Sequence, residues 1–179
     1  MKFVKGFKDF DKVSEELKYH VDNGIGLDDT VFRLGSDAHS KLFEEAKEYW
    51  DKGNIVLNGK GGWMAKNLEV GKKAIYKDNG RTSNVKLDSP GRGGDKKFIV
   101  YRNSGRTDEK GNIIAKKIQW GDTSGLSIKN DDPGAAASFW ARHQCDQKKK
   151  MDPNKPGFWA CYAPSLFGKQ LGLKSTQPW

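Results

Sequence analysis

The chain has 179 residues and a formal net charge of +9, with 35% hydrophobic and 31% charged residues. This length fits one medium domain or two small ones. No run approaches the ~18 apolar residues of a membrane span, and the N-terminus lacks the apolar stretch of a secretory signal, so we expect no membrane partner and a cytoplasmic location by default.

The positive charge is concentrated in the second half of the chain. Residues 1–90 carry 16 Lys and Arg against 15 Asp and Glu, whereas residues 91–179 carry 16 against 8. This asymmetry is typical of a protein that meets a polyanion or an acidic protein surface. A surface that is basic only for solubility is the alternative interpretation.

Two helices are predicted near the N-terminus. Apolar residues recur at three- to four-residue spacing over 7–22, and Asn23-Gly24 then interrupts the pattern. A second helix is predicted to begin at Ser36 or Asp37 and to end at Gly53, with its apolar residues on one face.

A less regular region follows these helices. The apolar run 55–57 fits a short strand, and residues 63–68 fit a single helical turn. The glycine clusters 59–62 and 91–94 lack the sequence context of a phosphate-binding loop. We interpret both clusters as flexible connectors.

Strands are predicted from residue 73 onward. Residues 74–76 and 85–87 fit a hairpin with a long loop, and 89–94 is the best candidate for a domain boundary. Residues 97–102 and 112–120 fit two antiparallel strands, and 126–128 could add a third. We therefore expect a helical N-terminal region over 1–90, with a short hairpin, and a basic domain over 91–179.

The C-terminal part is predicted to mix helix and strand. Asp132-Pro133 is a strong helix start, and this helix should reach about His143. Residues 159–162 fit a strand, and 164–173 a short amphipathic helix. The predicted fold class is α+β, with an N-terminal helical segment followed by a small antiparallel sheet with one packed helix.

Both cysteines of the chain lie close to a histidine in the sequence. His143, Cys145 and Cys161 supply three of the four ligands that a structural zinc site needs. A disulfide between the cysteines is the second possibility, and the third is a pair of buried thiols packed among aromatic residues. A fourth zinc ligand would come from one of several residues: His20, His39, Asp122 or Asp146.

A set of cations surrounds the same segment and could bind phosphates or acidic side chains. They are Arg142, Lys148, Lys149, Lys150 and Lys155. Cations that alternate with aromatic rings suit a nucleic-acid backbone with exposed bases. The alternatives are a solvated lysine-rich loop and aromatic residues that belong to the core. No spacing matches a trusted catalytic motif, so a metal-dependent nuclease, or Cys145 acting as a nucleophile with His143, is only a secondary hypothesis.

Four motifs in the second half give the chain a resemblance to a known group of proteins. Residues 96–101 carry K-K-F-I-V-Y, residues 117–122 carry K-I-Q-W-G-D, Ser138–Cys145 carries S-F-x-A-R-H-x-C, and Gly157–Cys161 carries G-F-W-x-C. Together they resemble a C-terminal cassette of uncharacterised tailed-bacteriophage proteins, some of which lie among head and assembly proteins. Where that group has basic residues before the S-F motif, this chain has Gly134 to Ala137.

The resemblance implies a viral origin and a place in the virion or the host cytoplasm. We expect a non-enzymatic structural protein, associated with the capsid or another virion surface, whose basic C-terminal half docks on viral capsid proteins, other virion proteins or DNA. It could also form homo-oligomers. The alternative expectation is a small zinc-binding nucleic-acid-binding protein or a metal-dependent nuclease that acts in the infected cell.

Overall fold

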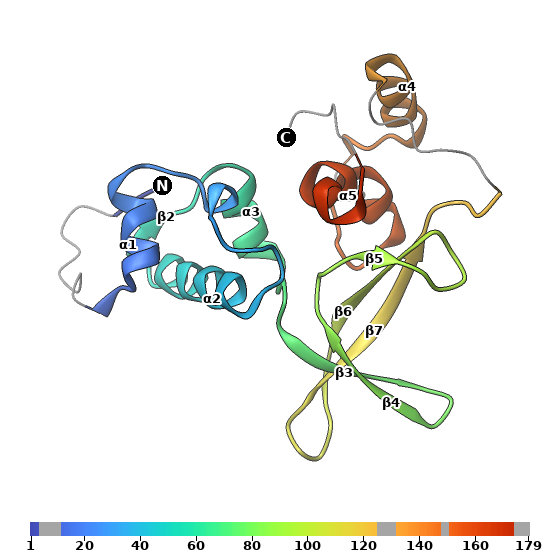
Figure 1. Ribbon diagram of the computed structural model, residues 1–179, viewed down its shortest axis with the longest axis horizontal. Coiled ribbons are helices and arrows are strands. Elements are labelled where there is room, and N and C mark those ends of the chain that lie inside the picture. Colours follow the sequence, from blue (N-terminus) through green and yellow to red (C-terminus); the bar gives the residue numbers. More distant parts are fainter. Residues whose placement is uncertain (4–11, 125–131, 148–150, 174–179) are drawn as a thin grey trace. The chain divides into compact units, whose positions relative to one another are not determined.

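The computed structural model describes residues 1–3, 12–124, 132–147 and 151–173. The chain divides into two compact units, Met1–Lys72 and Lys73–Trp179, which we call unit 1 and unit 2 (Figure 1). The fold class is α+β, as the sequence predicted, because helices of both units accompany a five-stranded sheet in unit 2.

Unit 1 is mainly helical. Its elements are β1 (Lys2–Phe3), α1 (Glu15–Asp22), the 3-10 helix η2 (Leu27–Asp29), α2 (Asp37–Asp51), β2 (Ile55–Val56) and α3 (Gly59–Asn67). The side chains of Ser14 and Ser36 accept hydrogen bonds from the first turns of α1 and α2, so serine caps fix where both helices begin. The second predicted helix is thus confirmed. The first predicted helix, 7–22, is confirmed only over Glu15–Asp22, because Ser14 caps the helix and Val13 is not helical. Residues 4–11 lie outside the described residues.

The glycine cluster 59–62 is not a flexible connector, which corrects the sequence interpretation. These residues form the first turn of α3, and the Gly61 amide donates to the Asp28 carboxylate over 2.9 Å. A β-carbon on Gly61 would lie 2.4 Å from the Asp28 backbone nitrogen. Glycine is therefore required here for the close approach of α3 to η2 rather than for chain flexibility.

Unit 2 is built on a mixed sheet with the strand order β4-β3-β7-β6-β5. The strands are β3 (Lys73–Asp78), β4 (Arg81–Lys86), β5 (Gly91–Arg92), β6 (Phe98–Thr107) and β7 (Ile113–Trp120). The predicted hairpin and the predicted antiparallel pair are both confirmed. However, β3 runs parallel to β7, so the sheet is not purely antiparallel.

That parallel pairing also explains why the observed division differs from the predicted boundary at residue 90. Ile75 lies opposite Ile114, and Tyr76 lies opposite Ala115, so the hairpin β3–β4 belongs to the sheet of unit 2. The turn of this hairpin is tighter than predicted, because it consists of Asn79 and Gly80 alone, both with positive φ. The second glycine cluster is likewise not a free connector, since Gly91 and Arg92 form β5.

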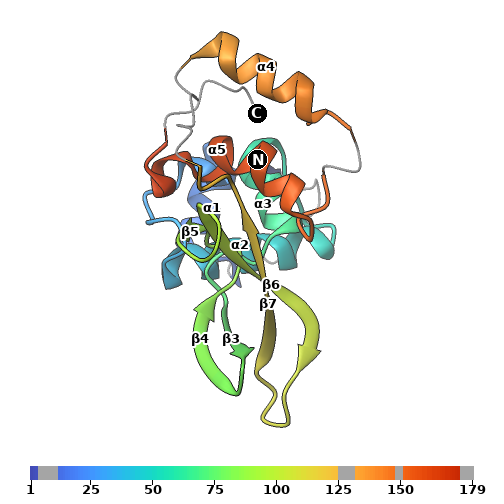
Figure 2. The ribbon, with the colours of Figure 1, turned by 90° about the vertical axis from the view of Figure 1, so that its right-hand side faces the viewer.

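Helix α5 (Pro156–Leu171) packs on the sheet and corrects the strand predicted at 159–162 (Figure 2). Its Trp159 is fully buried and lies 5.7 Å, ring centre to ring centre, from Trp120 of β7. Trp120 in turn stacks on Phe98 of β6. Because α5 is apolar on nearly all sides, its sequence has no helical periodicity, and a short window of it resembles a buried strand.

The end of α5 is fixed to the sheet edge. The Arg92 guanidinium donates two hydrogen bonds, over 3.2 and 3.0 Å, to the carbonyl oxygen of Leu171. Gly172 then ends the helix in the left-handed conformation. These contacts place Leu171 and Gly172 beside β5.

Helix α4 (Pro133–His143) has the start and the end that the sequence predicted. The Asp132 side chain accepts hydrogen bonds from the amides of Gly134 and Ala135, and Pro133 occupies the first position. The helix ends at Gln144, which adopts the left-handed conformation. The strand predicted at 126–128 lies outside the described residues.

Candidate binding pocket

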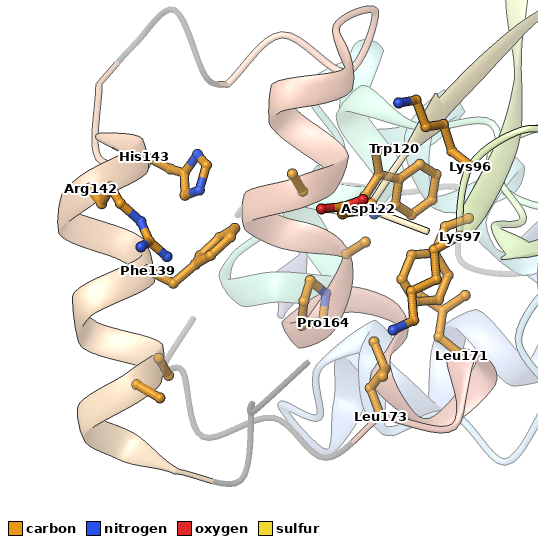
Figure 3. A pocket seen from close by; sticks show the side chains of 16 residues that line it. Lys96, Lys97, Trp120, Asp122, Phe139, Arg142, His143, Pro164, Leu171 and Leu173 are labelled. Atoms are coloured by element: carbon orange, nitrogen blue, oxygen red, sulfur yellow. The ribbon is translucent and has the colours of Figure 1, made fainter. Parts of the chain in front are cut away.

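A pocket of about 640 Å³ lies in unit 2, between α4 on one side and α5 with the ends of β6 and β7 on the other (Figure 3). Figure 3 shows Phe139, Arg142 and His143 reaching from α4 toward α5. This volume falls within the range of ligand-binding sites in proteins, roughly 300–1,000 Å³.

The position of α4 depends on a covalent link to α5. Cys145, just after α4, forms a disulfide with Cys161 of α5, and the two Cα atoms are 5.6 Å apart. The Tyr162 hydroxyl donates to the Cys145 carbonyl over 2.5 Å, and the Tyr162 ring meets Trp140 edge-on at 5.3 Å. Burial raises the pKa of Tyr162, which keeps this hydroxyl a donor. The last turn of α4 is thereby held against α5.

The lining of the pocket is mainly apolar. Small residues on both helices leave the space open, namely Ala135 and Ala136 on α4 and Ala160 and Ala163 on α5. Larger side chains from the sheet and from the end of α5 close the remaining sides, and they are Phe98, Trp120, Pro164, Leu171 and Leu173. Phe139 adds an aromatic ring that is only partly buried.

Basic residues flank this apolar lining on two sides. Arg142 and His143 stand at the end of α4, while Lys96 and Lys97 stand across the pocket, just before β6 (Figure 3). The His143 ring lies 4.2 Å from the Phe139 ring, which orients the imidazole over the pocket wall.

One carboxylate lies among these cations. Asp122 accepts hydrogen bonds from the Ser124 hydroxyl and amide, over 2.6 and 2.9 Å. These bonds hold the pKa of Asp122 below its usual value, so the carboxylate is charged at neutral pH. The rim formed by Lys96, Lys97, Arg142 and Asp122 therefore keeps an excess of positive charge whether His143 is protonated or not.

The structure separates the residues that the sequence proposed as one site. Arg142 and His143 line the pocket, whereas Lys155 is the exposed residue just before α5 and does not. Lys148, Lys149 and Lys150 lie outside the described residues.

The interpretation of Cys145 and Cys161 as zinc thiolates does not fit their observed state. Both sulfur atoms are bonded to each other, which selects the disulfide among the three alternatives that the sequence left open. Within residues 1–3, 12–124, 132–147 and 151–173, no three His, Cys, Asp or Glu side chains lie close enough to share a metal ion. His143 is exposed and Cys145 is buried, so the two side chains face different surroundings.

Sequence reasoning misses several residues of the pocket. In the sequence, Lys96 and Lys97 mark only the start of a strand motif, and Ala135 and Ala136 stand where the phage cassette that the chain resembles has basic residues. The spacing of Ala160 and Ala163, which puts both on one face of a helix, would have been a signal if residues 159–162 had been interpreted as helix.

Comparison of the chain with protein-family models, with curated proteins and with solved structures finds no match. The helices within the described part of the chain include none that is long and apolar enough to cross a membrane.

Proposed function

We propose that this chain is a non-enzymatic structural protein of a tailed bacteriophage, which associates with the virion by docking unit 2 on an acidic surface of a capsid protein or another virion protein. The phage origin is supported by the cassette motifs of the second half. The docking role is supported by the charge and the lining of the pocket.

The difference in net charge is larger between the two units than between the two halves of the sequence. Residues 1–72 carry 12 Lys and Arg against 13 Asp and Glu, so the net charge of unit 1 is −1. Residues 73–179 carry 20 against 10, so the net charge of unit 2 is +10. A field of this kind attracts an acidic partner to unit 2 and raises the rate of encounter.

The observation that carries the proposal is the apolar pocket with cations on opposite sides. Apolar walls stabilise a bound group by removing it from water, and the cations select acidic neighbours of that group. The lining offers these binding contacts, and the sulfurs of Cys145 and Cys161 are bonded to each other and are not free thiols. This arrangement favours binding over catalysis.

The first test is whether the protein belongs to the particle. Virions of the phage that encodes the chain would be purified and washed in increasing salt, and the protein would be quantified by mass spectrometry. We expect a constant copy number at low salt and release at high salt, because salt screens contacts between exposed charges. Absence of the protein from low-salt particles would overturn the proposal.

A pair of variants tests which unit docks. Lys96→Gln with Arg142→Gln removes two positive charges from the pocket rim, and Arg33→Gln with Lys41→Gln removes two exposed charges from unit 1. We expect the double variant of unit 2 to be released from particles at a lower salt concentration than the wild type. The double variant of unit 1 should be released at the same salt concentration as the wild type. Release of both double variants at the same salt concentration would argue against docking through unit 2.

DNA binding is a second candidate, favoured by the two hairpins of unit 2. Figures 1 and 2 show both hairpins projecting away from α5, and near their ends they carry the exposed cations Arg81, Arg106 and Lys110. If they bind phosphates, the logarithm of DNA affinity should fall linearly with the logarithm of salt concentration. In this candidate, zinc would require reduced Cys145 and Cys161, so zinc would be measured in the reduced protein. Lack of DNA binding at low salt would remove this option.

A further inference from the structure

We infer that the pocket receives one large apolar side chain from a partner segment that carries acidic residues on both sides of that side chain. This inference rests on the proposed docking function and specifies the chemistry of the partner. The occupant is a short stretch of another protein, not a free small molecule and not nucleic acid.

The apolar anchor follows from the lining. Phe98, Trp120 and Leu171 are each at most 7% exposed and close the inner side of the pocket. Ala136 and Ala163 are buried as well, and their short side chains leave space between α4 and α5. A large aliphatic or aromatic side chain that enters this space would lose most of its contact with water, which is how anchor residues stabilise interfaces.

The acidic flanks follow from the positions of the cations. Arg142 lies at one side of the opening, and Lys96 and Lys97 lie at the other, where their two charges exceed the single charge of Asp122 (Figure 3). A chain that crosses the opening therefore meets positive charge before and after its anchor. Carboxylates on both sides of the anchor satisfy this arrangement, whereas a molecule with a single anionic head would use only one side.

The length of the pocket wall favours a peptide segment. Lining residues of α4 extend from Ala135 to His143, which is about 12 Å along a helix that rises 1.5 Å per residue. A wall of two turns matches a few extended residues or a helical turn of a partner, as in known helix and peptide grooves. DNA would satisfy the cations but would leave the apolar lining without a matching group.

The test uses the full-length oxidised protein and fluorescein-labelled peptides with two Glu residues on each side of a central Phe, Leu, Trp or Ala. A second set replaces every Glu with Lys. Fluorescence anisotropy measures the affinity of each peptide. We expect the acidic peptides with an apolar centre to bind about thirtyfold or more tightly than the acidic peptide with a central Ala, and the Lys peptides to show no binding.

Two matched pairs of variants locate the binding site. Ala135→Phe fills the pocket, and Ala137→Phe places the same side chain on the exposed side of α4. Arg142→Gln removes a rim charge, and Arg106→Gln removes an exposed charge from β6. We expect Ala135→Phe to abolish peptide binding and Arg142→Gln to weaken it, while both partner variants bind as the wild type does. Unchanged far-ultraviolet circular dichroism confirms that each variant is folded.

Other results would overturn the inference. They are binding that does not depend on the central residue, equal binding of Lys peptides, peptide binding that survives Ala135→Phe in a folded variant, and no peptide binding at all. If the protein gives one of these results but remains on purified particles, the proposed function stands and this inference is wrong. Absence from particles together with normal peptide binding would overturn the proposed function alone.

Discussion

His39 is a histidine whose ionisation is opposed by its surroundings. It lies in the first turn of α2, is 2% exposed, and stacks on Phe43 with ring centres 4.1 Å apart. Burial lowers its pKa from 6.5 to about 4, because the charged imidazolium would lose its hydration. His39 thus stays neutral in the folded protein throughout the mildly acidic range.

This burial predicts a loss of stability in acid. Between pH 6.5 and about 4 the unfolded chain protonates His39 while the folded chain does not, so the free energy of unfolding falls by up to about 1.4 kcal/mol per pH unit in that window. Urea titrations of the wild type and of His39→Leu at several pH values would isolate this effect. Identical pH dependence in the two proteins would contradict it.

Gly61 offers a second prediction at this scale. Its missing side chain admits the backbone of η2, and an added β-carbon would lie 2.4 Å from the Asp28 nitrogen and 2.9 Å from the Leu27 carbonyl carbon. Because backbone atoms must then move, Gly61→Ala should lower the free energy of unfolding by about 1–3 kcal/mol. Gly91→Ala is the matched control, since no atom lies within 4 Å of its added carbon. A unit 1 melting temperature in Gly61→Ala equal to that of the wild type would refute the packing argument.

At the scale of elements, the disulfide decides how firmly α4 is held. It links two residues that are 16 positions apart in the sequence, and in the chain-entropy model a link of this length stabilises by about 3 kcal/mol. Once it is reduced, α4 keeps only non-covalent contacts with α5, such as the Trp140–Tyr162 pair.

Reduction of the disulfide is therefore predicted to make α4 more mobile and to weaken binding in the pocket. Hydrogen exchange of the α4 amides should become faster in the presence of a reductant, while exchange in α2, which belongs to unit 1, should not change. A variant with both Cys145→Ser and Cys161→Ser should show the faster exchange with or without reductant. Unaltered exchange of α4 after confirmed reduction would show that the disulfide does not hold the helix.

The capping of α4 gives another prediction about an element. The Asp132 carboxylate accepts from two amides of the first turn, at 2.9 and 3.0 Å. Asp132→Ala leaves these donors without a side-chain partner, which typically costs about 1 kcal/mol of helix stability. Asp132→Asn, which can still cap, should behave almost like the wild type. Hydrogen exchange of the first turn of α4 would measure the difference, and equal rates in both variants would argue against the cap.

At the scale of the whole molecule, each unit has buried apolar residues of its own. Each unit also contains one group whose state changes with the solution conditions, either pH or reductant. The core of unit 1 includes Leu17, Phe43 and Met64, and that of unit 2 includes Phe98 and Trp159. His39 belongs to unit 1, and the disulfide belongs to unit 2. Two compact units of this kind favour separate unfolding transitions.

We therefore predict two transitions in calorimetry of the full chain, each moved by a different treatment. Lowering the pH from 7 to 5 should move the unit 1 transition further in the wild type than in His39→Leu. Adding a reductant should lower the unit 2 transition and leave the other in place. A single transition that responds to both treatments would show that the molecule unfolds as one cooperative unit.

Local sequence determined the elements whose signals lie within a few residues. The caps at Ser36 and Asp132 define helix starts, and Asn79-Gly80 defines a hairpin turn, because each acts on its own neighbouring amides or backbone angles. Local sequence was misleading at residues 159–162, where a helix that is apolar on nearly all sides resembles a buried strand. Part of the candidate site, Arg142 and His143, was also recognised because it lies within one helix.

Tertiary structure alone decided the features that join distant segments. Because β3 pairs in parallel with β7, the first unit ends at residue 72. The cysteines Cys145 and Cys161 form a disulfide, which is one of the three states that the sequence allowed. Lys96 lies across the pocket from Arg142. None of these has a local signal, because strand pairing, sulfur–sulfur bonding and the lining of a pocket depend on which segments meet in space after the chain has closed its long loops.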